Sequence, residues 1–344
     1  MGSYRIAVVG AAGYAGEELV RLLSRHPKVC LALLTSRTHR GERADKVISG
    51  LPDAASRLVF EEPEISRLCE AEVVFLALPH GAAAEYALPL REAGRIVIDL
   101  SADFRLRNPK HYEADYGWSH PAPTLLSEAV YALPELHREK VRRADLLAVP
   151  GCYPTSILLA LYPALAADWL REEEMIVATS LSGTSGAGRR PEVPLLFSEM
   201  SENARPYGVP RHRHVDEMEQ ELDLLAGRKV HLAFVPHLIP LARGILSTIV
   251  CPLRAGIDPE EALAHYVSSY RADSFIRVLP LGTLPALRDV VRTNRAEIGL
   301  QCDADRRLLL LFCAIDNLGK GAAGQAVQAM NLRLGLPEGE GLLR

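Results

Sequence analysis

Cys152 stands in the sequence "VPGCYPT", between a strand-like segment and residues whose spacing predicts a helix, where a thiol could act as a nucleophile. The positive end of a helix lowers the pKa of a nearby thiol and so favours the reactive thiolate. Backbone N–H groups at the same turn could hold an oxyanion formed when sulfur attacks a carbonyl group. We therefore predict that Cys152 lies just before the helix and is a nucleophile. Gly151 keeps the approach to sulfur open, and Pro154 suits the first helical turn.

Two histidines could act on this thiol as a proton donor or acceptor. His212 and His214 precede a predicted helix, and in extended chain residues i and i+2 point to the same side. Glu217 could orient or polarise one of the imidazoles, while Asp216 and Glu219 match a helix N-cap and its partner three residues later. Two alternatives remain: a His-x-His metal pair, for which spacing places no third ligand, and exposed loop histidines.

A third segment, "SLSGTSGAGRR", follows a predicted strand and could bind an anion. Consecutive backbone amides and hydroxyl groups form an anion cradle, and guanidinium groups strengthen it. The alternative is a flexible loop without a ligand. The cradle would draw on Ser182, Gly183, Ser185, Gly186, Arg189 and Arg190.

The N-terminal segment "YRIAVVGAAGYAGEELVRLL" predicts a strand, a glycine turn and an amphipathic helix. Gly10, Gly13 and Gly16 have G-x-x-G-x-x-G spacing, a variant of the dinucleotide-binding pattern. Glycines here let the backbone approach a pyrophosphate, which the amides and dipole of the helix then stabilise. The sequence therefore predicts a nucleotide-binding turn.

The next strand, residues 29–35, indicates which nucleotide is bound. An NAD site would end this strand with an acidic residue for the ribose 2′-hydroxyl, but the chain offers Ser36, Arg37 and Arg40 before its first acid at Glu42. Hydroxyl and guanidinium groups suit a 2′-phosphate, so NADP is predicted; an ordinary basic surface loop is the alternative.

Two further apolar strands, residues 72–81 and 95–101, have the composition of parallel strands covered on both faces. Each ends in polar or glycine residues, where a doubly wound sheet presents its ligand edge. Leu78, Pro79 and His80 are therefore candidates to line the cofactor crevice.

The composition limits the classes of function. The chain has 344 residues, a hydrophobic fraction of 48%, a charged fraction of 24% and a formal net charge of -4, without long charge runs. These values argue against nucleic-acid and membrane partners and predict a soluble protein of two domains. None of the six cysteines has C-x-x-C spacing, and no signal sequence is evident, so neither structural zinc nor disulfides are expected.

The motifs taken together resemble one family, the N-acetyl-gamma-glutamyl-phosphate reductases, relatives of aspartate-semialdehyde dehydrogenase. One departure is Val215-Asp216, where the family pattern has Thr-Pro. The resemblance rests on "GAAGYAGEELVRLL", "SRTHRGE", "DLSADFRL", "YALPEL", "VPGCYPT", "SLSGTSGAGR", "HRHVDEMEQEL", "FVPHLIPLARGIL" and "DNLGKGAAGQAVQAMNL".

The resemblance implies that Cys152 is the nucleophile and that the His212–His214 segment supplies the acid/base, with His212 favoured and Glu217 beside it. Residue patterns and resemblance together predict two further sets of residues. Cofactor contacts are assigned to Gly10, Gly13, Tyr14, Ala15, Gly16, Ser36, Arg37, Arg40, Leu78, Pro79, His80, Ser182, Gly183 and Asn317. Substrate contacts are assigned to Arg105, Ser185, Gly186, Arg211 and His237.

The implied reaction is reduction of an acyl phosphate by NADPH through a cysteine thioester, releasing inorganic phosphate and an aldehyde. N-acetyl-gamma-glutamyl phosphate is the expected substrate, and the aminoadipyl phosphate of carrier-protein lysine biosynthesis is an alternative. A non-catalytic NADP-binding regulator and a reductase acting by direct hydride transfer are further alternatives.

The resemblance also implies the architecture. We expect an α/β Rossmann domain of residues 1–149 and 318–344, and an α+β catalytic and oligomerisation domain of residues 150–317. A cytoplasmic homo-oligomer, dimer or tetramer, without a metal, is expected. Within the second domain, Pro163 is expected to kink or end the helix after Cys152.

Overall fold

The computed structural model describes residues 3–342, which form two compact units. One unit contains the chain up to Pro150 and resumes at Ala322, and the other runs from Gly151 to Gly321. Each unit is built on a seven-stranded sheet, parallel in the first and mixed in the second. The predicted fold class, α/β followed by α+β, is confirmed.

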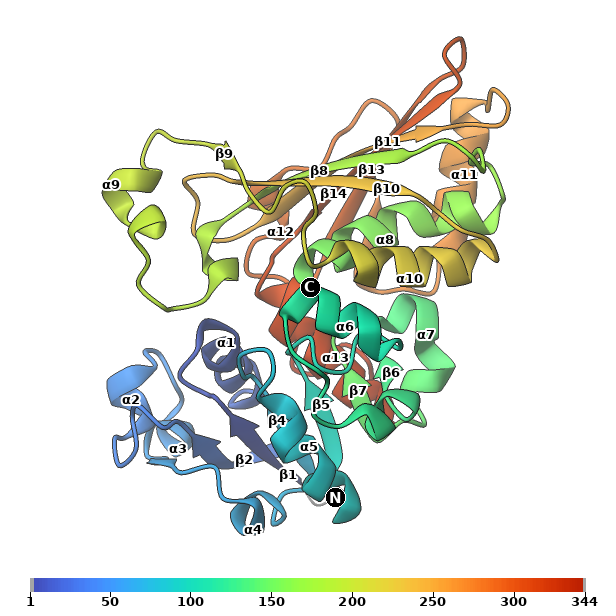
Figure 1. Ribbon diagram of the computed structural model, residues 1–344. Helices are drawn as coiled ribbons and strands as arrows, with labels where there is room; N and C mark the ends of the chain where they lie inside the picture. The colour runs from blue at the N-terminus through green and yellow to red at the C-terminus, as the bar shows by residue number, and fades with distance from the viewer. Residues whose placement is uncertain (1–2, 343–344) are drawn as a thin grey trace. The chain divides into compact units, whose positions relative to one another are not determined.

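The first unit has a doubly wound sheet with the strand order β3-β2-β1-β4-β5-β7-β6 (Figure 1). The chain moves outward from β1 in both directions, so the switch point lies between β1 and β4, where such sheets bind ligands. Its strands are β1 (Tyr4–Val9), β2 (Val29–Thr35), β3 (Phe60–Glu61), β4 (Val73–Leu76), β5 (Ile96–Asp99), β6 (Val130–Tyr131) and β7 (Leu146–Ala148).

Helices cover both faces of this sheet, which explains why its central strands are almost wholly apolar. One layer buries alanines and leucines of α5 on the sheet, and another packs α13 against α1 and α7. The helices are α1 (Tyr14–Leu23), α2 (Ala44–Val47), α3 (Asp53–Ser56), α4 (Ile65–Leu68), α5 (Ala83–Glu92), α6 (Pro109–Tyr116), α7 (Pro134–Val141) and α13 (Gly324–Arg333), with a 3₁₀ turn at Pro123–Ser127.

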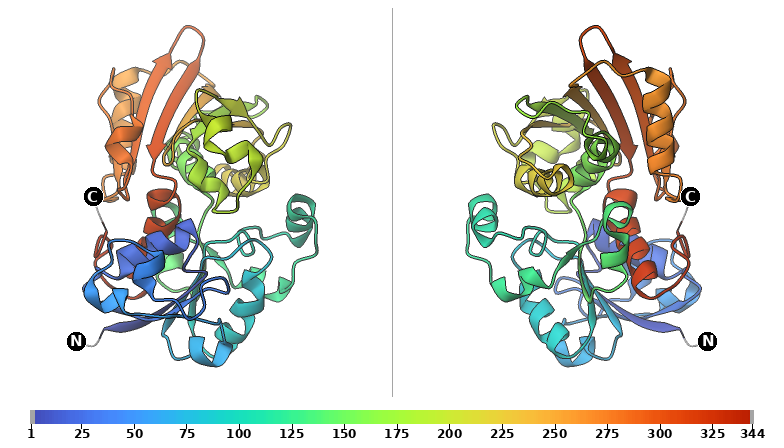
Figure 2. Two further views of the ribbon diagram at one scale, coloured as in Figure 1. Left: turned by 90° about the vertical axis from the view of Figure 1, so that its left-hand side faces the viewer. Right: turned by 90° about the vertical axis from the view of Figure 1, so that its right-hand side faces the viewer.

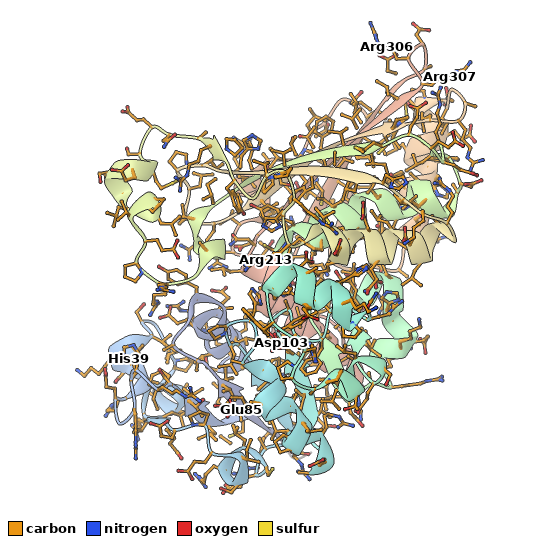
Figure 3. All side chains as sticks on the ribbon, in the orientation of Figure 1. His39, Glu85, Asp103, Arg213, Arg306 and Arg307 are labelled. Carbon is orange, nitrogen blue, oxygen red and sulfur yellow. The ribbon has the colours of Figure 1, made fainter. Side chains whose placement is uncertain are left out.

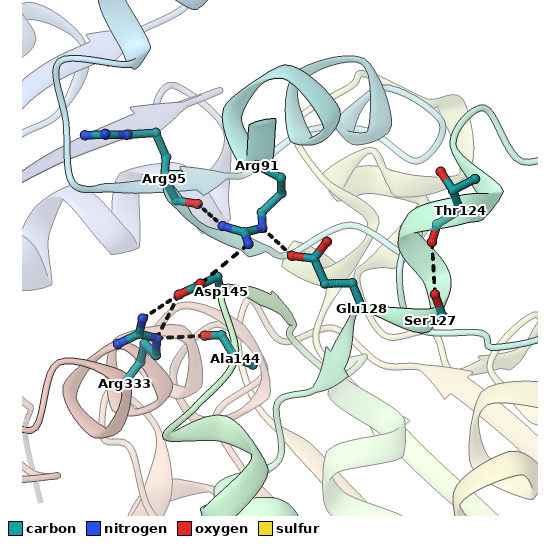
Figure 4. A network of polar contacts seen from close by, with 8 residues as sticks. All are labelled: Arg91, Arg95, Thr124, Ser127, Glu128, Ala144, Asp145 and Arg333. Atoms are coloured by element: carbon teal, nitrogen blue, oxygen red, sulfur yellow. Dashed lines mark hydrogen bonds and ion pairs between the residues drawn. The ribbon is translucent and has the colours of Figure 1, made fainter. Parts of the chain in front are cut away.

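A polar network attaches the last helix to this unit (Figure 4). Asp145, just before β7, accepts hydrogen bonds from Arg333 of α13 at 3.1 Å and from Arg91 of α5 at 3.5 Å. Arg91 also donates to Glu128 and to the carbonyl group of Arg95. The network therefore joins α13, from the end of the chain, to α5 and to the residue that precedes β7.

The second unit has the strand order β12-β13-β14-β11-β8-β10-β9. The long hairpin of β13 and β14 projects from the sheet in Figure 2, with Arg306 and Arg307 at its tip in Figure 3. The strands are β8 (Ile176–Ser182), β9 (Arg205–Pro206), β10 (Leu232–Leu238), β11 (Ile245–Pro252), β12 (Ile276–Val278), β13 (Ala296–Asp303) and β14 (Leu308–Ile315).

The strands β8, β10 and β11 each alternate strictly between buried and more exposed residues, so helices cover only one face of this sheet. Helices α8, α10 and α11 pack with one another and against the strands. The helices are α8 (Cys152–Ala166), α9 (Phe197–Met200), α10 (Val215–Ala226), α11 (Pro259–Ser269) and α12 (Leu287–Val290), with 3₁₀ turns at Thr184–Ala187 and Val193–Leu195 and a π-helical turn at Gly319–Ala323.

Pro163 was expected to kink or end the helix after Cys152, and it does not end α8, which continues to Ala166. A proline inside a helix leaves the carbonyl group four residues earlier without its usual donor. That carbonyl belongs to Leu159, and the hydroxyl group of Tyr270 donates to it. Tertiary contact therefore replaces the missing bond. No helix among residues 3–342 is long and apolar enough to cross a bilayer.

Candidate active site

Cys152 is the first residue of α8, one position further into the helix than predicted, and Gly151 is its N-cap. The side chain is half-buried rather than enclosed. N–H groups in a first helical turn have no acceptor within the helix. Since Pro154 has no N–H, the donors of this turn are those of Cys152 and Tyr153. This end of α8 is therefore suited to stabilising a thiolate or an oxyanion.

Glu217 holds the turn that precedes the cysteine. The buried backbone N–H of Gly151 donates to Oε1 of Glu217 at 2.8 Å, which connects α8 to the first turn of α10. Glu217 was predicted to polarise a histidine, and the hydrogen bond shown here gives its carboxylate a second task, positioning Cys152.

The π-helical turn after β14 packs directly on the cysteine. A Cβ atom at Gly321 would lie 2.9 Å from Cβ of Cys152 and 3.2 Å from the carbonyl oxygen of Asp316. Only glycine allows this approach, because Cβ atoms do not come so close to one another. The glycine therefore sets one wall of the site.

Five rings gather beside the cysteine, centred on Tyr153. The centroid of its ring lies 5.6 Å from that of His212, 5.9 Å from His214 and 5.1 Å from Phe234. His212 lies 4.7 Å from His214, and 5.6 Å from the fifth ring, Tyr207. The structure thus brings both predicted histidines to the residue that follows Cys152.

His212 is held as a neutral imidazole. Burial, and secondarily the charge of Arg213, lowers the pKa of His212 to about 4. Its Nδ1 accepts the backbone N–H of His214 at 3.1 Å, which requires an unprotonated Nδ1 and places the proton on Nε2. His212 therefore offers an Nε2–H donor at neutral pH. Among residues 3–342 no group of three or more His, Cys, Asp and Glu side chains could hold a metal, so the His-x-His metal alternative gains no further ligand.

The predicted start of α10 is wrong by two residues, because His214 is the N-cap and its side chain makes no capping bond. Asp216 instead forms an ion pair with Arg211, and Glu219 accepts the backbone N–H of Leu232. Arg211, predicted to bind substrate, is therefore engaged at the helix start. The exposed Arg213 lies between the two histidines in the chain, and its charge lowers the pKa of His212; it was missed as a site residue (Figure 3).

The predicted anion cradle is not formed as expected. The backbone N–H groups of Gly183, Thr184 and Ser185 donate to the carbonyl oxygens of Gly244, Leu241 and Ala242, at 2.9, 2.8 and 3.1 Å. Amides that already have acceptors cannot also bind an anion. A Cβ atom at Gly183 would lie 2.7 Å from the backbone of Ala242, so this glycine serves close packing.

Asn317 fixes the same loop from the other side. Its Oδ1 accepts the N–H of Gly244 at 2.8 Å, and its Nδ2 donates to the hydroxyl group of Ser185 at 2.9 Å. Gly186 has open space, with Nδ2 of Asn317 at 3.8 Å from the position of a Cβ atom. Asn317 was predicted to contact cofactor, and the bonds shown here make it a support of the loop.

The structure does not bring His237 to the ring cluster. On β10, Phe234 faces the helices and His237, three residues further on, points to the opposite face, paired with Leu181. His237 is therefore not part of the ring cluster, and its assignment as a substrate ligand stays a prediction. Arg105 was predicted to contact substrate, but its side chain is buried in the first unit. There it donates to the carbonyl oxygens of Val149 and Leu100, each at 2.8 Å.

The glycine turn of the first unit fits a dinucleotide. Gly10 has a φ of +76°, and a Cβ atom there would lie 2.3 Å from the carbonyl oxygen of Ala77; one at Gly16 would lie 2.3 Å from that of Gly10. These two glycines serve packing at the switch point. A Cβ atom at Gly13, the N-cap of α1, would meet nothing closer than 3.6 Å, so protein packing does not demand glycine there. A pyrophosphate that approaches the start of the helix does require glycine at this position.

One residue of the segment after β2 lines a cavity of about 390 Å³, together with Glu62, Glu64, Glu85 and Tyr86 among others. Arg37 lines it and donates to the hydroxyl group of Tyr86 at 3.0 Å, while Arg40 pairs with Glu62 at 3.5 Å. The buried hydroxyl group of Ser36 accepts the N–H of His39. Tyr14 and Ala15 open α1, as predicted for a nucleotide-binding turn.

Leu78, Pro79 and His80 follow β4, at the carboxyl edge predicted for them. Nδ1 of His80 accepts the N–H of Ala102 at 3.0 Å. The carboxylate of Asp103 accepts hydrogen bonds from the N–H groups of Gly81 and Ala83, at 2.7 and 2.9 Å. It therefore lies at the start of α5. The loop is thereby held in place at the switch point.

Sequence reasoning missed several residues of the cysteine site. Tyr153, Gly321, Arg213 and Phe234 lie in motifs already singled out, and adjacency to Cys152, a glycine pattern and adjacency to the two histidines were the available signals for the first three. Phe234 and Tyr207 are brought to the site only by folding.

Two family profiles match the chain. The semialdehyde dehydrogenase NAD binding domain matches residues 5–144, and the semialdehyde dehydrogenase dimerisation domain matches residues 152–317. The protein called N-acetyl-gamma-glutamyl-phosphate reductase in Methylacidiphilum infernorum is 45% identical over 346 residues, with 100% of both chains covered. The protein of that name in Syntrophobacter fumaroxidans is 47% identical over 98% of this chain and 97% of its own. The predicted resemblance is confirmed.

Solved structures share the fold at lower identity. Aspartate semialdehyde dehydrogenase II of Vibrio cholerae has a TM-score of 0.74 and 19% identity, covering 97% of this chain and 99% of its own. The Candida albicans aspartate semialdehyde dehydrogenase with NADP has a TM-score of 0.71 and 17% identity, covering 96% of this chain and 98% of its own.

Replacing Gly321 by alanine should displace the cysteine without unfolding the protein. Because the new methyl group would lie 2.9 Å from Cβ of Cys152, the side chain must shift, and we expect kcat/KM to fall about 10- to 100-fold. Gly256→Ala is the control, since its nearest neighbour would lie at 3.6 Å. Equal activity of the two variants would contradict the assigned packing.

The two roles of Glu217 can be separated by substitution. Glu217→Gln keeps an oxygen that accepts the N–H of Gly151, so we expect activity within about threefold of wild type. Glu217→Ala leaves a buried donor without an acceptor and should lower unfolding free energy by about 1–3 kcal/mol as well as activity. Denaturant unfolding and steady-state kinetics measure both effects. If both variants lose activity equally, the main role of Glu217 is to act on a histidine through its negative charge, and its hydrogen bond to Gly151 is of minor importance.

Proposed function

This chain belongs to the N-acetyl-gamma-glutamyl-phosphate reductase family of semialdehyde dehydrogenases, and we propose that it reduces N-acetyl-gamma-glutamyl phosphate to N-acetylglutamate 5-semialdehyde in arginine biosynthesis. The observation that carries the proposal is the placement of a half-buried Cys152 at the first position of α8, beside two histidines. An acyl phosphate is an electrophile that a thiolate attacks readily. We also place the enzyme in the cytoplasm.

In the first step, the Cys152 thiolate attacks the acyl carbon, the bond from that carbon to the phosphate oxygen breaks, and inorganic phosphate leaves. The amides at the start of α8 stabilise the negative charge on the carbonyl oxygen during this attack. The product is a thioester on Cys152. Glu217 and Gly321 keep the sulfur in position by holding the backbone on either side of it.

NADPH, when bound, would supply the hydride that reduces the thioester carbon. The oxyanion that results is the second charge the site must stabilise, and Nε2–H of His212 and the helix amides are suited to it. Of the two histidines, His212 is favoured for this role, and because it is a neutral imidazole its Nε2–H hydrogen-bonds the oxyanion without giving up the proton. The oxyanion then re-forms the C=O bond as the carbon–sulfur bond breaks, which releases the aldehyde and the Cys152 thiolate.

We assign NADP(H) to the first unit. The turn around Gly13 at the start of α1 would hold the pyrophosphate, and Arg37 would hold the 2′-phosphate, with Ser36 beside it. No acidic residue ends β2, which supports NADP over NAD. Leu78, Pro79 and His80 would line the nicotinamide side of the switch point.

The reaction is tested most directly in reverse. We expect wild-type protein to oxidise N-acetylglutamate semialdehyde with NADP only when inorganic phosphate is present, and more slowly with NAD, measured as NADPH absorbance. Cys152→Ala should lose at least about 10³-fold in kcat, because the covalent route is removed, with unchanged affinity for NADPH by fluorescence titration.

Each contrary outcome identifies a different alternative. Retained activity in Cys152→Ala would indicate direct hydride transfer. Turnover of the aminoadipate analogue but not of the glutamate compound would indicate the lysine pathway. Inertness with both substrates, together with intact NADPH binding, would indicate a non-catalytic regulator.

We further propose that a second copy of the chain covers the open face of the second sheet. On β8, Val177 is 42% exposed and lies between Ala233 of β10 and Val250 of β11. Leu181 is 38% exposed and lies between His237 of β10 and Leu246 of β11. An apolar sheet face left without helices favours association. The dimerisation-domain profile that matches residues 152–317 supports this assignment.

A charge on that face should dissociate the oligomer. Val177→Arg would bury a guanidinium group without a partner in the interface, so we expect a lower molecular mass by light scattering at micromolar concentration. Leu224→Arg is the control, because Leu224 is 51% exposed on α10, which packs against the other face. An unchanged mass for Val177→Arg would place the interface elsewhere.

A further inference from the structure

Arg37, in the loop after β2, is an exposed arginine held by a neutral partner. Its Nη2 donates to the hydroxyl group of Tyr86 at 3.0 Å, and among residues 3–342 no carboxylate forms an ion pair with it. Arg40 of the same loop instead pairs with Glu62 at 3.5 Å. An ion pair neutralises a guanidinium group, whereas a phenol oxygen accepts its hydrogen bond and leaves the positive charge available to another anion.

The backbone of this loop is fixed at both ends. The N–H of Ser36 donates to the carbonyl oxygen of Glu61 at 3.2 Å, and the N–H of Gly41 donates to that of Phe60 at 2.8 Å, so the loop is tied to β3. What remains variable is the direction of the long Arg37 side chain. A side chain that is already held loses less rotamer freedom when an anion binds.

Tyr86 offers a rigid point for this hydrogen bond. It lies in α5, 49 residues after Arg37, and is only 5% exposed. Its ring belongs to the same buried apolar cluster as Leu68 and Leu90, which joins α5 to the first sheet. The position of its hydroxyl group is therefore set by the core and not by the loop.

The cavity beside this pair is acidic. Its lining of about 390 Å³ includes Arg37 and Tyr86 together with three carboxylates, those of Glu62, Glu64 and Glu85. An Arg37 side chain released from Tyr86 would be attracted to these carboxylates, and they would also repel a phosphate group. Binding of a phosphate at this place therefore depends on how the guanidinium group is directed.

We propose that Tyr86 determines the preference for NADP over NAD, as a positioning residue that keeps Arg37 from pairing with the cavity glutamates and available to the 2′-phosphate. The proposal rests on the proposed assignment of the 2′-phosphate to Arg37. Glu85, next to Tyr86 in the chain, acts in the opposite sense, because its charge attracts the guanidinium group and repels the phosphate. NAD has no 2′-phosphate, so its binding does not use this arrangement.

The test is Tyr86→Phe, read as the dissociation constants of NADPH and NADH by fluorescence titration of the full-length protein. Phenylalanine keeps the buried ring and removes the acceptor oxygen. Loss of this hydrogen bond should weaken NADPH binding about 3- to 10-fold and leave NADH binding unchanged. Tyr266→Phe is the matched control, because Tyr266 is a buried tyrosine of the second unit whose hydroxyl group donates to the carbonyl oxygen of Ala160 at 2.8 Å.

Two further substitutions show whether Tyr86 acts through Arg37. Arg37→Ala should weaken NADPH binding at least about tenfold, and adding Tyr86→Phe to it should cause no further loss, because nothing is then left to position. Glu85→Gln removes one cavity carboxylate and should strengthen NADPH binding about twofold. Its control is Glu92→Gln, at the other end of α5 and outside the cavity lining.

Equal weakening of NADPH and NADH binding in Tyr86→Phe would overturn the proposal, since it would indicate a general effect on packing. Unchanged NADPH binding in that variant, or losses that multiply in the double variant, would overturn it too. If Arg37→Ala leaves NADPH binding unchanged, the 2′-phosphate lies elsewhere, and the assignment of Arg37 fails together with this proposal. If Arg37→Ala weakens binding and Tyr86→Phe does not, this proposal alone fails. These outcomes are read from binding, so an enzyme inert in the proposed reaction would leave them decisive.

Discussion

The site depends on holding the first turn of one helix open to an anion inside a packed protein. N–H groups at a helix start have no partner in the helix, and burying them empty is costly. In α8, Pro154 has no N–H, and the N–H of Gly151 donates to Glu217. The half-buried thiol stands at this positive end of the helix dipole, which favours a thiolate or an oxyanion. The same turn therefore matters both for the packing of the protein and for the reactivity of the thiol.

The residues that pack on that turn are closely held by hydrogen bonds and by a glycine contact. Gly321 contacts Cys152 with no room for a methyl group, and the turn that contains it is fixed by Asp316, which accepts the N–H groups of Leu318 and Gly319 at 2.8 and 3.1 Å. Asp316 also pairs with Arg243 at 3.0 Å, so its buried charge is compensated. A site that must position one sulfur atom is thus surrounded by buried polar groups with specific partners.

The second sheet separates two tasks by the alternation of its strands. Residues such as Phe234 face the helices and complete the ring cluster, whereas His237 and Val177 face away from them. One strand can therefore serve the reaction on one side and association on the other. The same alternation explains why a histidine that belongs to a recognisable motif does not join the other histidines.

The sequence by itself determined the local features: the glycine turn, the cysteine at a helix start, the alternation of strands and the family to which these belong. Such features depend on residues close in the chain, where spacing dictates geometry. Only the tertiary structure decided which groups remain available. Arg105 and the backbone amides of residues 183–185 donate to backbone carbonyl groups and are not available to a ligand. Glu217 accepts a hydrogen bond from Gly151, and the hydroxyl group of Tyr207 bonds to that of Tyr153, 54 positions earlier in the chain. Hydrogen-bond partners distant in sequence are set by how whole elements pack, and no local pattern encodes that.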